Sequence, residues 1–414
     1  MLRELGHDLL PLEAVRDAIL SLIEPLSAEP RALESAHGAV LREDLLARES
    51  IPPFDNSAMD GFAVREAELR AASEDRPVTL KIQGGLPAGD PGGAPLQPGA
   101  SIRIMTGAPM PPGADAVVPH ELTRFDAERV AFTKPVKAGH NIRRAGGDLR
   151  PGDVPLRAGA VLGGPQLAIA ASLGYTSVLA TRPLRVAIIS PGNELVDASE
   201  KPGPGKIRNS NAYSLMGLLR SAGAEPVNLG IIRDTKEEVL GAIEHAVLLG
   251  ADGIVSTGGV SAGDYDFVQA VVRESARPGH VFKVAMRPGK PQVFGLFSGK
   301  PLFGLPGNPA ASIVSFEVFV RPALRKMRGE AKLLEQAFGV RFPFEHHYKP
   351  GRVFLLRARV EPDPAGGYRV LPPGEQDSSF LSSLADANVI IALPADRDRV
   401  LEGEVMPAMW MGGQ

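Results

Sequence analysis

Apolar residues recur along this chain in two patterns, helical spacing and short strand-like runs, and the two patterns divide it into regions. A helix is predicted over residues 12–24, where apolar residues fall on one face. From about residue 49 to 144 short runs such as 78–82 alternate with clusters of proline and glycine. This region is therefore predicted to be a small, mostly β module, followed by a helix over 165–173.

The pattern changes again at about residue 183, where strands and helices begin to alternate. Strands are predicted over 184–189, 227–232 and 253–256, and helices over 212–220, 235–249 and 267–274. This alternation predicts βαβ units and a mostly parallel sheet. Short β runs return beyond residue 329, which predicts a C-terminal β domain.

Polar clusters follow three of the predicted strands in the α/β region. They are Ser190–Glu194, Arg233–Asp234 and the glycine-rich stretch Thr257–Gly263. Ligands of open α/β sheets bind outside the carboxyl ends of the strands. Since all three clusters follow strands of one sheet, we expect them to surround one binding site.

The segment ADGIVSTGGVSAGDYDF, residues 251–267, carries the strongest local signal. Glycines directly after a strand let backbone N–H groups approach an anion, and the next helix start adds positive potential. Asp264 and Asp266 suit Mg²⁺, which favours one or two carboxylates together with phosphate oxygens. The alternative is an ordinary strand-to-helix turn with an aspartate cap.

A second helix start and a group of cations add to the case for an anion site. Asn308 and Pro309 occupy the N-cap and first positions of a helix predicted over 310–324. Lys283 and Arg287 are expected on one face of a strand, with Lys290 in the turn that follows. Cations near helix starts are unfavourable without an anion, although a solvated run of charge is the simpler explanation for any one of them.

Composition narrows the classes of function. The 414 residues contain no cysteine, which excludes disulfides, thiolate metal sites and a cysteine nucleophile. The net charge of −3 is well mixed, so no nucleic-acid partner is expected. No apolar run approaches bilayer length and no secretory leader is recognisable, so we expect no membrane association and a cytoplasmic protein.

Taken together, the motifs of this chain resemble those of the molybdopterin molybdenumtransferase family, called MoeA in bacteria and related to the E domain of gephyrin in animals. The resemblance covers nearly the whole chain in family order. The matching stretches are FDNSAMDGFAV, RIMTGAPMPPGADAVV, GHNIRRAGGDLRPGD, SPGNELV, STGGVSAGDYDF, MRPGKPQVFG and FGLPGNPAAS.

The resemblance implies a transferase of molybdenum cofactor biosynthesis. Such enzymes insert molybdate into adenylylated molybdopterin, release AMP and require Mg²⁺. The implied partners are a second copy of the chain in a homodimer, the molybdopterin adenylyltransferase and the downstream enzymes that accept the cofactor. A cleavage of this kind depends largely on positioning and charge stabilisation, so no protein nucleophile is needed.

The resemblance also implies roles for individual residues. The implied catalytic residues are Asp60, Thr106, Asp148, Glu194, Asp234 and Asp266, of which Glu194, Asp234 and Asp266 are the implied metal ligands. The implied substrate-binding residues are Gly258, Gly259, Ser261, Gly263, Lys283, Arg287, Lys290, Pro306, Asn308, Pro309, Arg352 and Ser378.

Two positions depart from the family pattern. Arg287 stands where lysine is common, which keeps the charge but changes the geometry and the number of donors. Ala311 stands where many relatives carry serine, and the neighbouring Ser312 should face about 100° away around the helix. A hydroxyl expected near molybdate is thus predicted to be absent.

The implied fold is α/β and multidomain, with a Rossmann-like molybdopterin-binding domain. An elongated segment comprises residues 1–48 and 145–180, and a β-rich domain comprises 49–144. The molybdopterin-binding domain comprises 181–328, and the C-terminal β domain comprises 329–414. In the homodimer, the active site is expected between the α/β domain of one subunit and the β-rich domain of the other.

Two alternative functions belong to other classes. A dimeric scaffold could bind a phosphorylated ligand or a partner peptide without chemistry, but the acids Asp60, Asp234 and Asp266 favour an enzyme. The adenylylating step belongs to a smaller family that shares only the α/β domain, and the complete N-terminal half argues against it. Molybdate and tungstate are equally compatible with these motifs.

Overall fold

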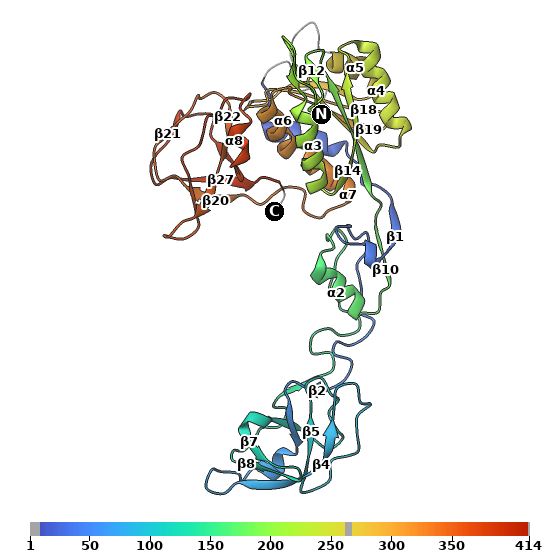
Figure 1. Ribbon diagram of the computed structural model, residues 1–414, viewed down its shortest axis with the longest axis vertical. Helices are drawn as coiled ribbons and strands as arrows, with labels where there is room; N and C mark the ends of the chain where they lie inside the picture. The colour runs from blue at the N-terminus through green and yellow to red at the C-terminus, as the bar shows by residue number, and fades with distance from the viewer. Residues whose placement is uncertain (1–8, 261–266, 413–414) are drawn as a thin grey trace.

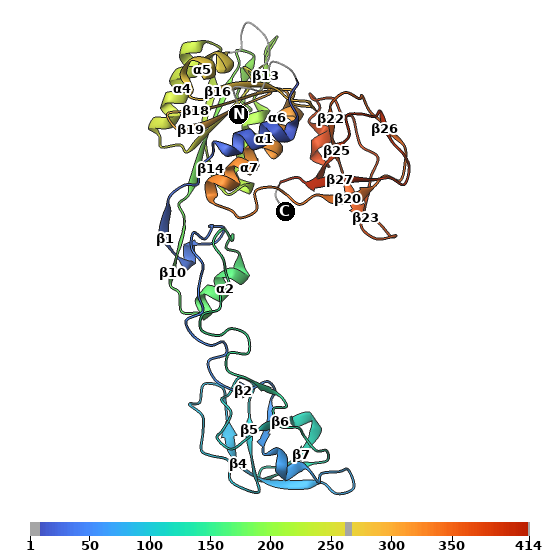
Figure 2. The ribbon, with the colours of Figure 1, turned by 180° about the vertical axis from the view of Figure 1, so that it is seen from behind.

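The computed structural model describes residues 9–260 and 267–412 of the chain. The molecule is elongated: an α/β body and a C-terminal β domain lie side by side at one end, and an N-terminal β domain lies at the other (Figures 1 and 2). A narrow stalk connects the two ends. This arrangement confirms the predicted α/β multidomain fold class.

The α/β body is built on a six-stranded sheet with the order β14-β11-β15-β19-β18-β16. The strands are β11 (Leu184–Pro191), β14 (Ala224–Ile232), β15 (Gly253–Thr257), β16 (Gly279–Lys283), β18 (Pro291–Phe297) and β19 (Lys300–Leu305). The first four strands in the sheet order are parallel, and β18 pairs antiparallel with both β19 and β16. The mostly parallel sheet expected from the alternating pattern is therefore confirmed.

Helices cover both faces of this sheet because successive strand residues point to opposite sides. Val186 and Ile188 of β11 join the core that contains α1, α3 and α6–α7, whereas Ala187 and Ile189 join the core under α4 and α5. The helices are α1 (Leu12–Ser21), α3 (Ser210–Ser221), α4 (Lys236–Leu248), α5 (Phe267–Ser275), α6 (Pro309–Ser315) and α7 (Arg321–Arg328).

The last helix of the body is longer than the predicted 310–324 and is not regular. A π-helical stretch, η5 (Phe316–Val320), joins α6 to α7. Pro322 lies in the first turn of α7 and has no N–H to donate to the preceding turn, which favours such an irregularity. The helix ends at Gly329, whose φ of 76° suits a left-handed cap.

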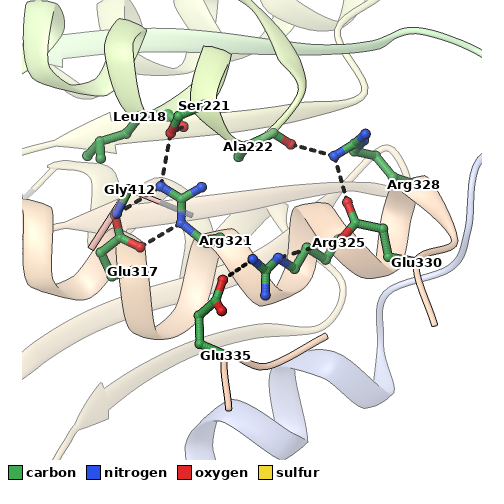
Figure 3. A network of polar contacts seen from close by, with 10 residues as sticks. All are labelled: Leu218, Ser221, Ala222, Glu317, Arg321, Arg325, Arg328, Glu330, Glu335 and Gly412. Atoms are coloured by element: carbon green, nitrogen blue, oxygen red, sulfur yellow. Dashed lines mark hydrogen bonds and ion pairs between the residues drawn. The ribbon is translucent and has the colours of Figure 1, made fainter. Parts of the chain in front are cut away.

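A buried ion pair lies at this irregular helix (Figure 3). Arg321 donates to both carboxylate oxygens of Glu317, at 2.5 and 2.9 Å, and the two side chains are only 3% and 2% exposed. Arg321 also donates to the Ser221 hydroxyl at 3.1 Å, and the Gly412 N–H donates to Glu317 at 3.2 Å. The pair therefore ties η5 and α7 to α3 and to the C-terminal segment.

Glu317→Ala is expected to lower the free energy of unfolding by about 3–5 kcal/mol, because it leaves the Arg321 guanidinium buried without its carboxylate. Urea denaturation measures this change. The double variant Glu317→Leu/Arg321→Met removes both charges and should recover most of the loss. A loss below about 1 kcal/mol for Glu317→Ala would mean that water reaches Arg321 in the variant.

The N-terminal β domain contains a six-stranded sheet with the order β6-β3-β5-β4-β8-β7. Its strands are β3 (Gly61–Val64), β4 (Val78–Leu86), β5 (Ala100–Ile104), β6 (Ala116–Pro119), β7 (Thr123–Phe125) and β8 (Arg129–Phe132). A short pair, β2 (Asn56–Ser57) with β9 (Ile142–Arg143), closes the end nearest the stalk. The strand-like run 78–82 is confirmed as part of β4.

The stalk consists of two chain segments that run past each other. β1 (Ala28–Ala32) pairs with β10 (Ser177–Thr181), and α2 (Gly164–Ser172) packs beside them. Isolated bridges then join Leu45 to Leu156 and Ile51 to Leu149. The N-terminal β domain is therefore an insertion whose two connections lie side by side.

The C-terminal domain contains a seven-stranded sheet with the order β17-β22-β25-β27-β20-β24-β23. The strands are β17 (Met286–Arg287), β20 (Phe338–Arg341), β22 (Val353–Ala358), β23 (Val360–Pro362), β24 (Tyr368–Val370), β25 (Val389–Leu393) and β27 (Val405–Trp410). A short helix, α8 (Ser382–Ala385), and the pair β21 (His346–His347) with β26 (Arg399–Val400) complete it. Its edge strand β17 precedes β18 of the α/β sheet, so this segment joins the two bodies.

Among the helices in the described ranges, none combines the length and the apolar character needed to cross a membrane.

Candidate active site

A cavity of about 860 Å³ lies between the carboxyl ends of the parallel strands and the C-terminal domain. Its walls come from the segments after β11 and β15, the start of α3, the start of α6, the turn after β17 and the loop before α8. The predicted site residues in its wall are Glu194, Gly258, Gly259, Arg287, Lys290, Pro306, Asn308, Pro309, Arg352 and Ser378. Residues predicted from separate motifs are thus brought together.

Two glycines after β15 line the cavity and turn the chain sharply there. Gly258 and Gly259 have φ values of 91° and 68°, which other residues rarely adopt. A Cβ at Gly259 would lie 2.9 Å from the Val268 side chain, and one at Gly258 would lie 3.2 Å from the Pro191 carbonyl oxygen. Both the backbone conformation and the neighbouring atoms therefore require glycine at these two positions of the cavity wall. Ser261 and Gly263, predicted as further contacts, lie outside the described residues.

The start of α6 forms another part of the wall. Asn308 occupies the N-cap position and Pro309 follows it, as predicted. The Asn308 side chain does not cap its own helix; its amide donates to the Ser378 hydroxyl at 2.9 Å. The Asn211 amide of α3 donates to the Gly307 carbonyl oxygen at 2.8 Å, which fixes this turn from the other side.

The turn that carries Arg287 and Lys290 is held by a buried amide. Gln292 is 3% exposed, and its amide nitrogen donates to the Gly289 carbonyl oxygen at 2.8 Å and to the Ser315 hydroxyl at 2.6 Å. Gly289 has a φ of 98°, and a Cβ there would lie 2.5 Å from Met286. The turn is therefore rigidly placed against α6.

The cations of the wall have no ion-pair partner within the described residues. This holds for Arg287, Lys290 and Arg352 alike, since none lies within 4.0 Å of a described carboxylate oxygen. Three such cations around one cavity make it suited to a multiply charged anion.

The expectation that Lys283 and Arg287 share one face of a strand is wrong. Lys283 ends β16 in the α/β sheet, whereas Arg287 belongs to β17 in the C-terminal sheet. The chain changes sheets at Val284 and Ala285, whose N–H groups donate to the Lys290 and Leu10 carbonyl oxygens. Lys283 is exposed and does not line the cavity of this chain.

Two of the predicted acids lie near one another after β11 and β14. Glu194 lines the cavity, and a Cβ at Gly192 would lie only 2.9 and 3.0 Å from its carboxylate oxygens. The Asn193 side chain accepts the Asp234 N–H at 3.3 Å, which places the segment after β14 beside this turn. Asp266, the third predicted acid here, lies outside the described residues.

Among the described residues there is no cluster of three or more His, Asp or Glu that could hold a metal ion alone. Glu194 and Asp234 nevertheless fit the donor set of Mg²⁺, which accepts one or two carboxylates when phosphate oxygens complete it. Glu194 lies in the cavity wall, where the phosphate oxygens of a bound anion would complete this set of ligands.

Asp60 and Thr106 form a second polar cluster, in the N-terminal β domain. The N–H and the hydroxyl of Thr106 both donate to one carboxylate oxygen of Asp60 at 2.7 Å. These hydrogen bonds, helped by the charges of His120 and Arg103, lower the pKa of Asp60. Asp60 is therefore a fixed, ionised and exposed carboxylate. His120, whose ring lies 3.3 Å from the Asp60 carbonyl oxygen, was missed by sequence reasoning.

Asp148 lies where the stalk meets the N-terminal β domain. Its N–H donates to the Ile51 carbonyl oxygen at 2.9 Å, and its side chain is exposed. The N-terminal β domain, in which Asp60 directly precedes β3 and Thr106 follows β5, lies at the opposite end of the molecule from the α/β body (Figures 1 and 2). Within one chain, Asp60, Thr106 and Asp148 therefore lie away from the cavity.

The structure adds cavity residues that sequence reasoning missed. They are Arg208, Asn209, Asn211, Gln376 and Asp377. Arg208 lies in β13 (Ile207–Arg208), which pairs with β12 (Leu195–Val196), and it donates to the Ala198 and Glu200 carbonyl oxygens at 3.0 Å. A signal existed for Asn209, which caps α3 by accepting the Ala212 N–H at 3.2 Å. No signal existed for Gln376 and Asp377, although Ser378 of the same loop was among the residues that the resemblance implied.

Three family models match this chain in succession. They are the MoeA N-terminal region (domain I and II) over residues 10–174, the probable molybdopterin binding domain over 187–326 and the MoeA C-terminal region (domain IV) over 340–409.

Full-length relatives agree with the family models. The chain is 36% identical to a molybdopterin molybdenumtransferase of Nostoc sp., with 96% of this chain and 94% of that protein covered. It is 37% identical to molybdopterin molybdenumtransferase 2 of Mycobacterium tuberculosis, with 90% and 92% covered. The crystal structure of a molybdopterin biosynthesis MoeA protein from Pyrococcus horikoshii is similar with a TM-score of 0.83 and 28% identity, covering 97% of this chain and 100% of that one.

Proposed function

The chain belongs to the molybdopterin molybdenumtransferase (MoeA) family, and on this premise we propose that it inserts molybdate into adenylylated molybdopterin and releases AMP. It is accordingly a transferase of molybdenum cofactor biosynthesis. The observation that carries the proposal is the cavity, where Arg287, Lys290 and Arg352 surround a floor of glycines without any described ion-pair partner.

The substrates match the chemistry of this cavity. Adenylylated molybdopterin carries phosphate and pyrophosphate oxygens, and molybdate is a tetrahedral dianion. The backbone N–H groups of Gly259 and Ala311 in the cavity wall suit phosphate oxygens, whereas those of Gly258 and Ala310 already donate to the Leu305 and Ser378 carbonyl oxygens. We assign Arg287 and Lys290 to molybdate, with Arg352 and Ser378 completing its surroundings from the C-terminal domain.

Magnesium is part of the proposal. Glu194 and Asp234 would hold it together with substrate phosphate oxygens, and Asp266 is proposed as the third ligand. When bound, the ion would neutralise the negative charge on the phosphate oxygens beside the bond that is cleaved between molybdopterin and AMP. The protein residues themselves position the two anions and exclude competing water.

A homodimer is also proposed, because one chain separates the predicted catalytic residues. Asp60, Thr106 and Asp148 lie far from the cavity, at the other end of the stalk. In a dimer with two-fold symmetry, the N-terminal β domain of each elongated chain can reach the cavity of the other chain. The two active sites of the dimer are then formed together. Each active site would then contain the cavity of one subunit and Asp60 of the other.

The scaffold alternative is not favoured. A protein that only bound a phosphorylated ligand would have no need for a carboxylate fixed like Asp60, and the full-length relatives are named as enzymes. The adenylyltransferase and the downstream cofactor-accepting enzymes remain the proposed partners, and we propose a cytoplasmic location. Tungstate has the same shape and charge as molybdate and is proposed as a competing substrate.

Ala311→Ser is expected to lower the molybdate concentration for half-maximal rate by about three- to tenfold. Ala311 lines the cavity, whereas Ser312 is fully buried outside its wall, so this chain lacks the hydroxyl that many relatives place there. One added hydrogen bond stabilises a complex by roughly 1 kcal/mol. Molybdate titrations of AMP release measure the effect, with Ser312→Ala as the matched control. An unchanged or weaker molybdate dependence in Ala311→Ser would contradict this assignment.

The proposed function is tested by incubating the purified full-length protein with adenylylated molybdopterin, molybdate and Mg²⁺ and following AMP by chromatography. AMP release is expected only when molybdate and the divalent ion are both present. Chelation of the ion and omission of molybdate are the controls. Binding of adenylylated molybdopterin without any molybdate-dependent release of AMP would contradict the enzyme and favour a binding protein.

A further inference from the structure

The loop that closes the cavity from the C-terminal domain is anchored on both sides. The Gln376 side chain accepts the Arg357 N–H and donates to the Arg357 carbonyl oxygen, both at 3.1 Å, so its amide bonds to both backbone groups of this β22 residue. On the opposite side, the Ala310 N–H donates to the Ser378 carbonyl oxygen at 3.1 Å. Asp377 lies between these two anchors, in the cavity wall.

Arg357 lies directly behind this wall and is 1% exposed. One of its guanidinium nitrogens, Nη2, donates to the Asp377 carbonyl oxygen at 3.3 Å. The other two, Nε and Nη1, have no hydrogen-bond partner within residues 9–260 and 267–412. A buried guanidinium with so few partners costs stability, because the loss of hydration is not offset by a paired charge.

The carboxylate of Asp377 lies in the field of two cations. It accepts the hydroxyl and the N–H of Ser379 at 2.6 and 2.9 Å, which closes a tight turn. These two bonds lower the pKa of Asp377, and the charges of Arg287 and Arg357 lower it further. Despite this attraction, Asp377 forms no ion pair with Arg287 among the described contacts, so Arg287 stays available to the cavity.

We propose that Arg357 and Asp377 together set the anion affinity of the cavity: Arg357 holds Asp377 in the Ser379 turn, which keeps its carboxylate from pairing with Arg287. The inference rests on the proposed function, since it takes an anion at Arg287 as given. Arg357 is a positioning residue in this account, because it acts on the anion only through Asp377 and Arg287.

The test measures the binding of molybdate alone to the full-length protein by calorimetry, without any turnover. Arg357→Met keeps the volume of the side chain but removes its charge. It is expected to weaken molybdate binding about tenfold. Its thermal stability should be unchanged or higher, because a buried charge is removed. Adding Asp377→Asn should restore the affinity of Arg357→Met to within about twofold of the wild type.

Arg359→Met is the matched control, since Arg359 is exposed two residues along the same segment and should leave the affinity unchanged. An unchanged affinity in Arg357→Met overturns the inference, as does a weakened affinity that Asp377→Asn fails to restore. Absence of molybdate binding to the wild type overturns it too. AMP release by the wild type is measured separately, so failure of the positioning role and failure of the proposed function give different results.

Discussion

Asp60→Asn is expected to lower the rate of AMP release by about a hundredfold or more, the scale on which a positioned acid–base or charge-stabilising group acts. The substitution keeps the size of the side chain and removes the charge that Thr106 stabilises with two hydrogen bonds of 2.7 Å. Because hydrogen bonds from Thr106 lower the pKa of Asp60, the wild-type carboxylate is charged at neutral pH.

Steady-state kinetics and circular dichroism together separate this loss from unfolding. The matched control is Asp126→Asn, since Asp126 is an exposed aspartate of the same domain that accepts the Glu128 and Arg129 N–H groups at 2.8 Å. The control should keep wild-type activity. Wild-type turnover in Asp60→Asn would remove this residue from the mechanism.

Lys290→Ala is expected to raise the molybdate concentration for half-maximal rate by about tenfold or more, while disturbing the binding of adenylylated molybdopterin much less. Lys290 lines the cavity without a described ion-pair partner, and the Gln292 amide holds the turn that carries it. Molybdate titrations at saturating adenylylated molybdopterin measure the shift. Sulfate, a tetrahedral dianion as well, should compete weakly at the same place.

Lys349→Ala removes an exposed lysine of the C-terminal domain and should leave both substrates unaffected. The Lys290→Ala result also tests which of the two anionic substrates this lysine binds. If the molybdate dependence stays unchanged and binding of adenylylated molybdopterin is lost, Lys290 holds the pterin phosphate, and the assignments of the two anions must be exchanged.

Much of the cavity could be predicted from the sequence because its walls follow regular elements. The polar segments after β11, β14 and β15 were expected at one edge of a parallel sheet, and the structure places these strands side by side. The N-cap position of Asn308 was also predicted correctly. In each case a short local signal, a strand end or a helix start, fixes where the side chains lie.

Features that depend on pairing between distant segments were not predicted. The hairpin of β18 and β19 turns at Ser298 and Gly299, both with positive φ, and serine gives no signal for such a turn. The separation of Lys283 from Arg287 arises because β17 pairs with β22, which follows more than sixty residues later. Likewise, the hydrogen bond from Arg357 to the Asp377 carbonyl oxygen depends on packing inside the C-terminal domain.

The central claim is that one active site combines the cavity of one subunit with Asp60 of another, and mixing two inactive variants tests it most directly. Asp60→Asn and Glu194→Gln subunits are combined in equal amounts, subunit exchange is verified by mass, and AMP release is measured. Each mixed dimer would carry one site with both substitutions and one with neither, so the mixture should recover about a quarter of wild-type activity. Activity that stays at the level of the separate variants after complete exchange would contradict a site shared between subunits.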